Sequence, residues 1–357
     1  MSDSASIWTS SSPPVLSIRL GAIQLKNPVI CASSEITMTA DGIRAAIDSG
    51  VGAVIAKSVN EKPAAAAQLA KADYVLLDDD FGPIPWQAQE RLNASLFCRS
   101  GLAPTPLDGW LPMLAELDRY AQTKQSYVVG SITVADAGPA GEIAGRMQQA
   151  GLRWIELNLG APHGRESAAI SQITARDAVR EYVRTVRRAV SIPLAVKLTA
   201  QADDPLGLAA TAIDEGADMI VLSGRVQGFM PDIETQEPIL GSWGAIGGHW
   251  ALPTSLYWVS KGWRNLPRKV SIIGTNGARS GNDVLRFLLS GAQAVEMASA
   301  AITNGAEIFS KIIGELQSYC ERKQIARLEE IVGRAADKAR SYDQIEAREW
   351  SRFPWEG

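Results

Sequence analysis

The sequence lacks the motifs of several metal-dependent protein classes. Only three of its 357 residues are cysteine, and Cys31, Cys98 and Cys320 lie far apart. None belongs to a C-x-x-C pair, so the sequence offers neither a zinc motif nor an iron–sulfur motif. We therefore expect no metal site, and any redox cofactor would have to be organic.

Strong charge and long apolar runs are also missing. The formal net charge is −4, and no Lys/Arg-rich run is present, so nucleic acid is not an expected partner. The first residues, MSDSASIWTSSSPP, are polar and lack the apolar core of a signal peptide. No apolar run approaches the roughly 18 residues of a membrane helix. We expect a soluble, cytoplasmic protein that does not enter a membrane.

What is abundant is apolar side chains and glycine. The composition is 46% hydrophobic with 31 glycines, which is typical of a globular α/β protein with many tight turns. Short apolar runs recur along the chain, at 29–32, 53–57, 127–132, 154–158, 194–198, 219–223, 270–274 and 294–298. Residues 140–151 and 175–190, between such runs, have apolar positions every three to four residues, as helices do. Eight strands alternating with helices predict a (β/α)8 TIM barrel.

Three segments depart from this regular alternation. Residues 16–30 alternate apolar and polar around Gly21 and predict an N-terminal β-hairpin before the first barrel strand. A long stretch after strand 2, residues 58–126, predicts a lid or rim insertion, and 226–253 is a second irregular connection. We expect a barrel domain over 16–320 and a charged, helical C-terminal tail over 321–357.

Polar side chains at strand ends predict the site, because loops after the strands form the active face of a barrel. Lys57 and Lys197 end two apolar strands, and either a shared anionic ligand or an internal ion pair would explain them. Asn158 opens a turn that contains His163. The glycine-rich turns after strands 7 and 8, in 272–284 and 296–309, suit phosphate binding by backbone N–H groups.

Several segments, taken together in order, resemble the flavin-binding barrel of the class 1 dihydroorotate dehydrogenases. At one loop the closer resemblance is to dihydropyrimidine dehydrogenase, and the whole resemblance covers residues 16–320. The matching segments are NPVICAS (27–33), AKSV (56–59), ELNLGAPHG (156–164), AVKLT (195–199), AIGG (245–248), IIGTNG (272–277) and GAQAVEMASA (291–300).

The resemblance implies bound FMN, with lysines near the flavin that stabilise its reduced form. The implied flavin-binding residues are Ala32, Ser33, Lys57, Ser58, Asn158, Lys197, Ser223, Gly247, Gly248, Gly274, Asn276, Gly277, Ala298 and Ser299. The implied substrate-binding residues are Cys98, Arg99, Ser100, Asn158, His163 and Arg225.

The sequence departs from this family at the catalytic position. The family loop reads N-L-S-C-P followed by Asn or His, whereas Ala161 stands here where a cysteine or serine acid/base is expected. Alanine cannot transfer a proton, so another group must do so. His163 is the first candidate because the pKa of histidine lies near neutrality, Cys98 is the second and Glu35 the third.

The substrate loops differ as well. CRSGLAP (98–104) and SGRVQG (223–228) carry fewer amides and more guanidinium groups than the family loops, and Arg99 and Arg225 would suit a clamp on an anion. We expect an FMN-dependent oxidoreductase that transfers a hydride between flavin N5 and a small planar, polar substrate, either anionic or heterocyclic. A homodimer and a separate electron acceptor, or oxygen, are expected partners.

Three other interpretations remain open from the sequence. The chain could be a flavin-dependent oxidase or monooxygenase that uses oxygen, or a non-catalytic flavin-binding subunit that lost activity with the change to Ala161. It could also be a phosphate-binding aldolase barrel without flavin, in which Lys57 or Lys197 forms a Schiff base.

Overall fold

The computed structural model describes residues 15–60, 62, 67–133, 136–161, 173–199, 201–347 and 355. Its centre is a closed barrel of eight parallel strands, in which the last strand pairs with the first. The barrel strands are β3 (Val29–Cys31), β4 (Ala53–Ile55), β8 (Tyr127–Ile132), β9 (Ile155–Asn158), β10 (Leu194–Leu198), β11 (Met219–Leu222), β14 (Ser271–Thr275) and β15 (Ala294–Met297). The predicted (β/α)8 barrel is therefore confirmed.

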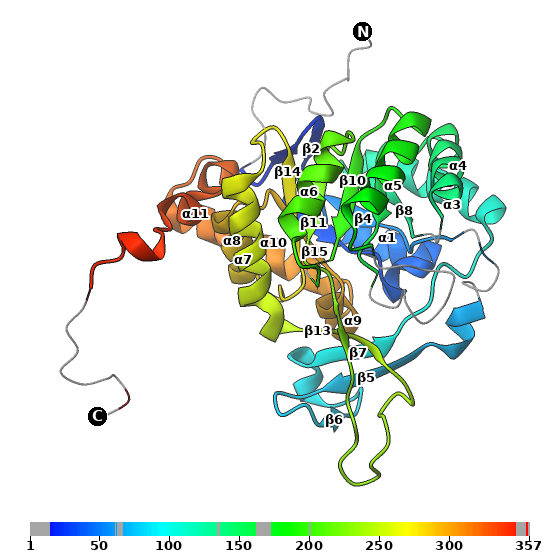
Figure 1. Ribbon diagram of the computed structural model, residues 1–357, viewed down its shortest axis with the longest axis horizontal. Coiled ribbons are helices and arrows are strands. Elements are labelled where there is room, and N and C mark those ends of the chain that lie inside the picture. The colour runs from blue at the N-terminus through cyan, green and yellow to red at the C-terminus, as the bar shows by residue number, and fades with distance from the viewer. Residues whose placement is uncertain are drawn as a thin grey trace.

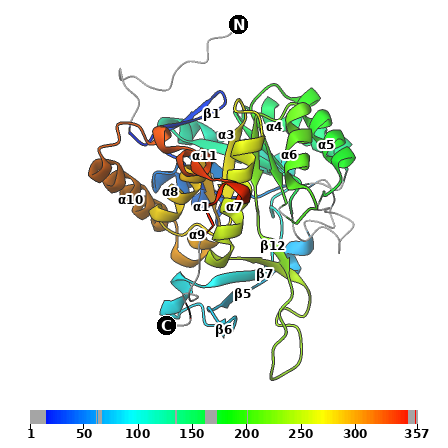
Figure 2. The ribbon, with the colours of Figure 1, turned by 60° about the vertical axis from the view of Figure 1, so that its left-hand side comes forward.

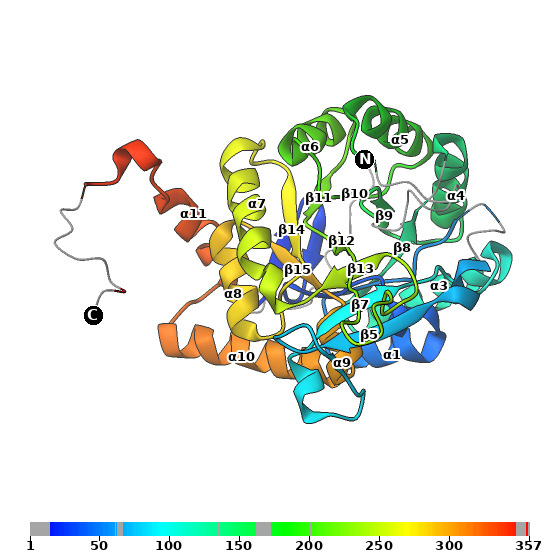
Figure 3. The same ribbon diagram turned by 60° about the horizontal axis from the view of Figure 1, so that its bottom comes forward.

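Helices surround the barrel as a ring, which Figure 3 shows from one end. In α5 (Arg176–Ala189), Val179, Val183 and Val186 form one buried stripe because they recur every three to four residues. The two predicted helices are therefore confirmed as α5 and α4 (Ala137–Gln149). The remaining long helices are α1 (Ala40–Asp48), α3 (Leu107–Thr123), α6 (Pro205–Asp214), α7 (Leu252–Asn265), α8 (Gly281–Ser290) and α10 (Glu307–Lys323).

The predicted N-terminal hairpin consists of β1 (Ile18–Leu20) and β2 (Ile23–Leu25), which pair antiparallel. Gly21 makes the turn with φ of 56°, a left-handed conformation that favours glycine. Ile18, Leu20 and Leu25 are fully buried, so the hairpin covers the core at its end of the barrel. Figure 2 shows the hairpin and the strands β5 to β7 at opposite ends of the molecule.

The two irregular connections combine into one structure over the other end of the barrel. From the first come β5 (Asp73–Leu77), β6 (Pro83–Ile84) and β7 (Ser95–Arg99), and from the second β12 (Val226–Gly228) and β13 (Gly244–Gly247). They form an antiparallel sheet in the order β12-β13-β7-β5-β6, which we call the cap sheet. It lies below the barrel in Figure 1. α3 lies within the predicted 58–126 insertion but packs on β8 as a member of the ring.

The C-terminal segment packs back on the barrel. The expected boundary at residue 320 falls inside α10, and a short α11 (Arg334–Lys338) follows. The Gly333 N–H donates to the Leu288 carbonyl at 2.8 Å, and the indole of Trp263 donates to Asp337 at 2.9 Å. Among the described residues, no helix is both long enough and apolar enough to span a membrane.

Candidate active site

Lys57 follows β4 at the mouth of the barrel and is held by Glu35, which follows β3. Its Nζ donates to Glu35 Oε1 at 2.8 Å, and the hydroxyl of Tyr74 from the cap sheet donates to the same oxygen at 3.0 Å. Burial raises the pKa of Glu35, but the charges of Lys57 and Arg225 outweigh it and lower that pKa to about 2. Burial in turn lowers the pKa of Lys57, against the attraction of Glu35. Glu35 is thus a fixed anion rather than a proton donor.

Lys197 lies deeper in the barrel, between two carboxyl groups on other strands. Its Nζ is 2.5 Å from Glu296 Oε2 and 3.8 Å from Glu156 Oε2. Glu156 is fully buried and Glu296 is 1% exposed. Both predicted lysines therefore form internal ion pairs.

Arg225 connects the barrel to the cap sheet. One guanidinium nitrogen donates to Cys98 Sγ at 2.6 Å and the other to Ser100 Oγ at 3.3 Å. Burial raises the pKa of the Cys98 thiol, although Arg225 opposes this, so the thiol form is favoured. Arg99, next to Cys98 on β7, reaches Asp73 at 3.6 Å instead. Since successive side chains of a strand point to opposite faces, Cys98 and Arg99 do not face the same pocket.

A small inner pocket of about 60 Å³ lies between Lys57 and Arg225. Ala161, where the family carries its acid/base, forms part of its wall. The described lining residues are Ser33, Lys57, Ser58, Ser100, Gly101, Leu102, Thr133, Asn158, Ala161 and Arg225. Thr133 brings a buried hydroxyl that has no hydrogen-bond partner within the described part of the chain. The pocket thus offers cations, hydroxyls and an amide to a polar ligand.

A second cavity covers the ends of β14 and β15, where the glycine-rich turns lie. Its described lining comprises Leu92, Asn93, Ala94, Arg225, Gly248, His249, Thr275, Asn276, Gly277, Ala278, Arg279, Glu296, Met297, Ala298, Ser299, Ala300 and Thr303. Small residues leave backbone N–H groups accessible there, and α9 (Ser299–Asn304) begins at its edge. His249, which the sequence did not single out, places Nδ1 2.9 Å from the Gly277 carbonyl oxygen.

The donor set fits FMN. Small residues and Arg279 at the second cavity suit a phosphate, while hydroxyls, an amide and lysine suit the polar edge of the flavin ring. Arg225 lines both cavities, so its side chain lies where they border one another. Ser223 and Asn276 also adopt positive φ, of 75° and 67°, a strained conformation that is common at functional sites.

The predicted glycines have different neighbours. At Gly247, an added Cβ would lie 2.8 Å from Cγ of Arg225, within the site. At Gly277, which has φ of 106°, it would meet the backbone of Leu252. At Gly274 it would collide with the ring of Phe287 in α8, so this glycine is required by helix packing.

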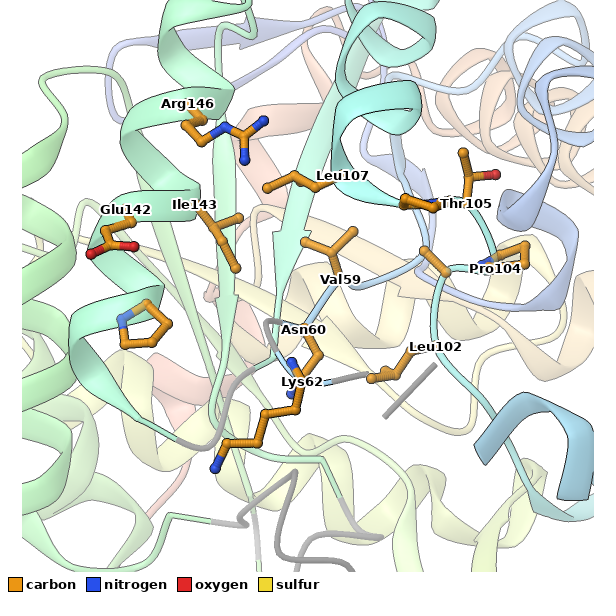
Figure 4. Close-up of a pocket in the computed structure, with 13 residues that line it drawn as sticks. Val59, Asn60, Lys62, Leu102, Pro104, Thr105, Leu107, Glu142, Ile143 and Arg146 are labelled. Atoms are coloured by element: carbon orange, nitrogen blue, oxygen red, sulfur yellow. The ribbon is translucent and has the colours of Figure 1, made fainter. Parts of the chain in front are cut away.

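A further cavity, of about 530 Å³, lies beside the inner pocket. Figure 4 shows Val59, Leu107 and Ile143 around the hollow, with Lys62 at its edge. Leu102 lines both this cavity and the inner pocket. The two cavities therefore adjoin at Leu102.

The structure brings together most of the predicted site and adds residues to it. Ala32, Ser33, Ser58 and Asn158 lie at the barrel mouth, whereas His163 is outside the described residues. Glu156 and Glu296 were not predicted as site residues. A carboxyl group inside an otherwise apolar strand could have indicated them. Tyr74 was missed because nothing in the sequence tells which residues of a long insertion return to the barrel.

Comparisons with known proteins agree with this geometry. A family model described as dihydroorotate dehydrogenase matches residues 91–320. The catalytic subunit of dihydroorotate dehydrogenase B (NAD(+)) from Methanocaldococcus jannaschii is 29% identical over 323 residues, which are 90% of this chain and 98% of the relative. The same subunit from Methanosarcina acetivorans is 29% identical, over 88% of this chain and 94% of the relative. The same subunit from Geobacter sp. is 26% identical, over 90% of this chain and 98% of the relative.

Proposed function

The chain belongs to the dihydroorotate dehydrogenase family, and we propose that it oxidises or reduces a small, planar, anionic substrate on bound FMN, with its proton chemistry altered from that of the family. It is an FMN-dependent oxidoreductase of the dihydroorotate dehydrogenase type. When bound, FMN supplies hydride transfer at N5. The proposal of an anionic substrate rests on the inner pocket, whose wall contains the cations Lys57 and Arg225.

The side chains of the pocket have separate roles in this proposal. Arg225 binds the anionic group of the substrate, because a guanidinium forms two parallel hydrogen bonds with a carboxylate. Asn158 orients the substrate, and its own position is fixed by the Gly160 N–H, which donates to Asn158 Oδ1 at 3.1 Å. Lys57, fixed by Glu35, keeps positive charge at the ring edge.

The proton must be handled by a group other than Ala161. Cys98 is a weak candidate because its buried thiol faces Arg225 and is not part of the pocket wall. His163 remains a proposal from the sequence. His163→Ala should lower turnover by about 10²-fold while FMN stays bound if this histidine is the acid/base. Unchanged turnover would assign the role to another group.

Two matched ligands test the substrate class. Orotate and uracil share a pyrimidine ring, and only orotate carries a carboxylate. In the FMN-loaded protein, Arg225→Gln should raise the Kd of orotate by about 10–100-fold, the cost of a hydrogen bond to a charged group, and leave the Kd of uracil nearly unchanged. Both constants are measured from the change in flavin absorbance.

Two results would count against the proposal. Purified protein that is colourless and takes up no FMN on reconstitution would reject the cofactor. Equal loss of orotate and uracil binding in Arg225→Gln, with the FMN content unchanged, would reject the anionic substrate while leaving the flavin enzyme in place.

A further inference from the structure

A cluster of two carboxyl groups and one ammonium lies inside the barrel, below the inner pocket. Glu156 comes from β9, Lys197 from β10 and Glu296 from β15. Lys197 Nζ is 2.5 Å from Glu296 Oε2 and 3.8 Å from Glu156 Oε2. Both glutamates are almost completely buried. With both ionised, the cluster would carry one uncompensated negative charge away from water, which is costly.

The oxygens of the two carboxyl groups indicate how this charge is removed. Glu156 Oε2 and Glu296 Oε1 are buried and have no hydrogen-bond donor among the residues that the structure describes. The two side chains are near enough to hydrogen-bond to one another, which requires a proton on one of them. Burial and the charge of Glu156 raise the pKa of Glu296 to about 8, against the attraction of Lys197. Burial and the repulsion between the two carboxylates thus favour one proton shared by the pair.

A row of hydroxyl groups leads from this pair to the inner pocket. Ser131 Oγ donates to Glu156 Oε1 at 3.0 Å, and Ser58 Oγ lies 2.8 Å from Ser131 Oγ. Because each hydroxyl has a single proton, Ser131 must accept from Ser58 when it donates to Glu156. Ser58 and Ser131 are 4% and 0% exposed, so water does not interrupt the row. Every hydrogen bond in it points toward the carboxyl pair.

The outer end of the row lies at the family's catalytic position. Ser58 and Ala161 both line the inner pocket, so a hydroxyl is available beside the alanine that cannot transfer a proton. Ser33 Oγ lies 3.3 Å from Ser58 Oγ and completes the row on that side. The pocket is thus connected to a buried proton acceptor that does not depend on a side chain at position 161.

We propose that Ser58, Ser131 and the Glu156–Glu296 pair form a proton path that exchanges the substrate's proton between the inner pocket and the barrel interior. In the oxidative direction, the substrate C–H bond breaks and its proton goes to Ser58 Oγ. The proton of Ser58 passes to Ser131 Oγ, and that of Ser131 to Glu156 Oε1. Bound FMN would supply the acceptor for the second hydrogen and its electron pair, and this part rests on the proposed function. Reduction of a substrate runs the same transfers in reverse.

The shared proton is measured directly by infrared spectroscopy of the FMN-loaded protein. The C=O stretching band of a protonated carboxyl should be present in the wild type and absent from both Glu156→Gln and Glu296→Gln. Each variant leaves a single carboxyl beside Lys197, whose positive charge compensates one carboxylate. Asp118→Asn is the control, because Asp118 is equally buried but paired with Arg153 at 2.7 Å, so it should leave the band in place.

Ser131→Thr and Ser131→Val test the path, since the two side chains have nearly the same volume and only threonine keeps the hydroxyl. After transfer to D2O, the carboxyl band should shift about 10²-fold more slowly in the valine variant than in the threonine variant, because proton transfer through position 131 is lost. The two Ser131 variants also test the proposal if a glutamate variant fails to fold.

The possible outcomes separate this inference from the proposed function. No protonated-carboxyl band in the wild type, or equal exchange in the two Ser131 variants, would overturn the proton path. If the protein holds no FMN but the carboxyl band still exchanges faster in Ser131→Thr than in Ser131→Val, the proton path is supported and the proposed flavin function is rejected.

Discussion

Glu35 shows how one carboxylate fixes the charges of the pocket. It accepts hydrogen bonds from both Lys57 and Tyr74, and its side chain is 21% exposed. Its folded-state pKa of about 2 lies below the ordinary value of 4.5, so its contribution to stability is complete above about pH 4.5. That contribution is lost as the pH falls from 4.5 toward 2.

Glu35→Gln should therefore destabilise the protein by about 1–3 kcal/mol at pH 7, because Lys57 loses a buried, charged partner. The difference from the wild type should narrow as the pH falls below about 4.5, where Glu35 of the unfolded wild-type chain begins to take up a proton. Urea unfolding at a series of pH values measures this. Glu116→Gln is the control, since Glu116 forms an exposed pair with Arg44 that contributes at most about 1 kcal/mol. A difference that stays constant down to pH 3 would contradict the assignment.

Gly274 gives a second prediction for a single residue. Since a Cβ at this position would lie within 2.6 Å of Cε1 of Phe287, Gly274→Ala should lower stability by about 1–3 kcal/mol through overpacking. Gly314→Ala is the matched control, because Gly314 lies in α10 with open space around it and should gain about 0.5–1 kcal/mol from helix propensity. Chemical denaturation measures both changes. A neutral Gly274→Ala would show that α8 adjusts freely.

The sequence showed which polar residues interrupt an apolar strand, but not which residues they contact in the folded protein. Lys57 and Lys197 stand out because each interrupts an apolar strand, and the glycine turns stand out by composition. Their partners could not be read in the same way, because Glu296 is 99 residues from Lys197 along the chain. Such contacts depend on the closure of the barrel, which no local pattern encodes.

The barrel elements were predictable because their signal is local. Each strand is an apolar run covered on both faces, and each helix shows its own periodicity. The cap sheet was not predictable, since β7 pairs with β13, where Cys98 lies opposite Ala245, 147 residues further along the chain. β5 to β7 and β12 to β13 were expected only as irregular connections, and their pairing is set by tertiary contacts.

The cap sheet has a small apolar core of its own. Phe97 packs there with Leu77, Leu240 and Ile246, in a cluster separate from the barrel core. Because the two cores are separate, the cap sheet should be able to open without the barrel unfolding. Such opening would give a ligand access to Arg225 and the inner pocket below.

Phe97→Ala should remove about 3–5 kcal/mol of packing from the cap sheet. In hydrogen exchange measured by mass spectrometry, β5, β7 and β13 should then exchange faster, whereas the barrel strands keep wild-type protection. Phe287→Ala, which changes the barrel core instead, should accelerate exchange throughout the molecule. Equal acceleration of barrel and cap sheet in Phe97→Ala would show that the two unfold as one unit.

The two ends of the molecule have different structural roles. At one end, the hairpin packs against the C-terminal segment, where the Leu328 N–H donates to the Val15 carbonyl at 2.8 Å, and this closes the core. At the other end, the cap sheet and the connections after the strands surround the inner pocket. Substrate, cofactor and any electron acceptor must therefore meet at the cap end.

The electron acceptor gives a prediction for the whole molecule. The relatives are named as catalytic subunits of an NAD(+) enzyme. For this chain, we predict that a reduced flavin returns its electrons to a separate acceptor. After anaerobic photoreduction, the isolated holoprotein should be reoxidised rapidly by ferricyanide, a small acceptor that needs no docking site, and only slowly by NAD+. Stopped-flow absorbance measures both rates. Rapid reoxidation by NAD+ alone would remove the need for a partner, and rapid reoxidation by air would favour an oxidase, because the reduced flavin would then react with oxygen at the site itself.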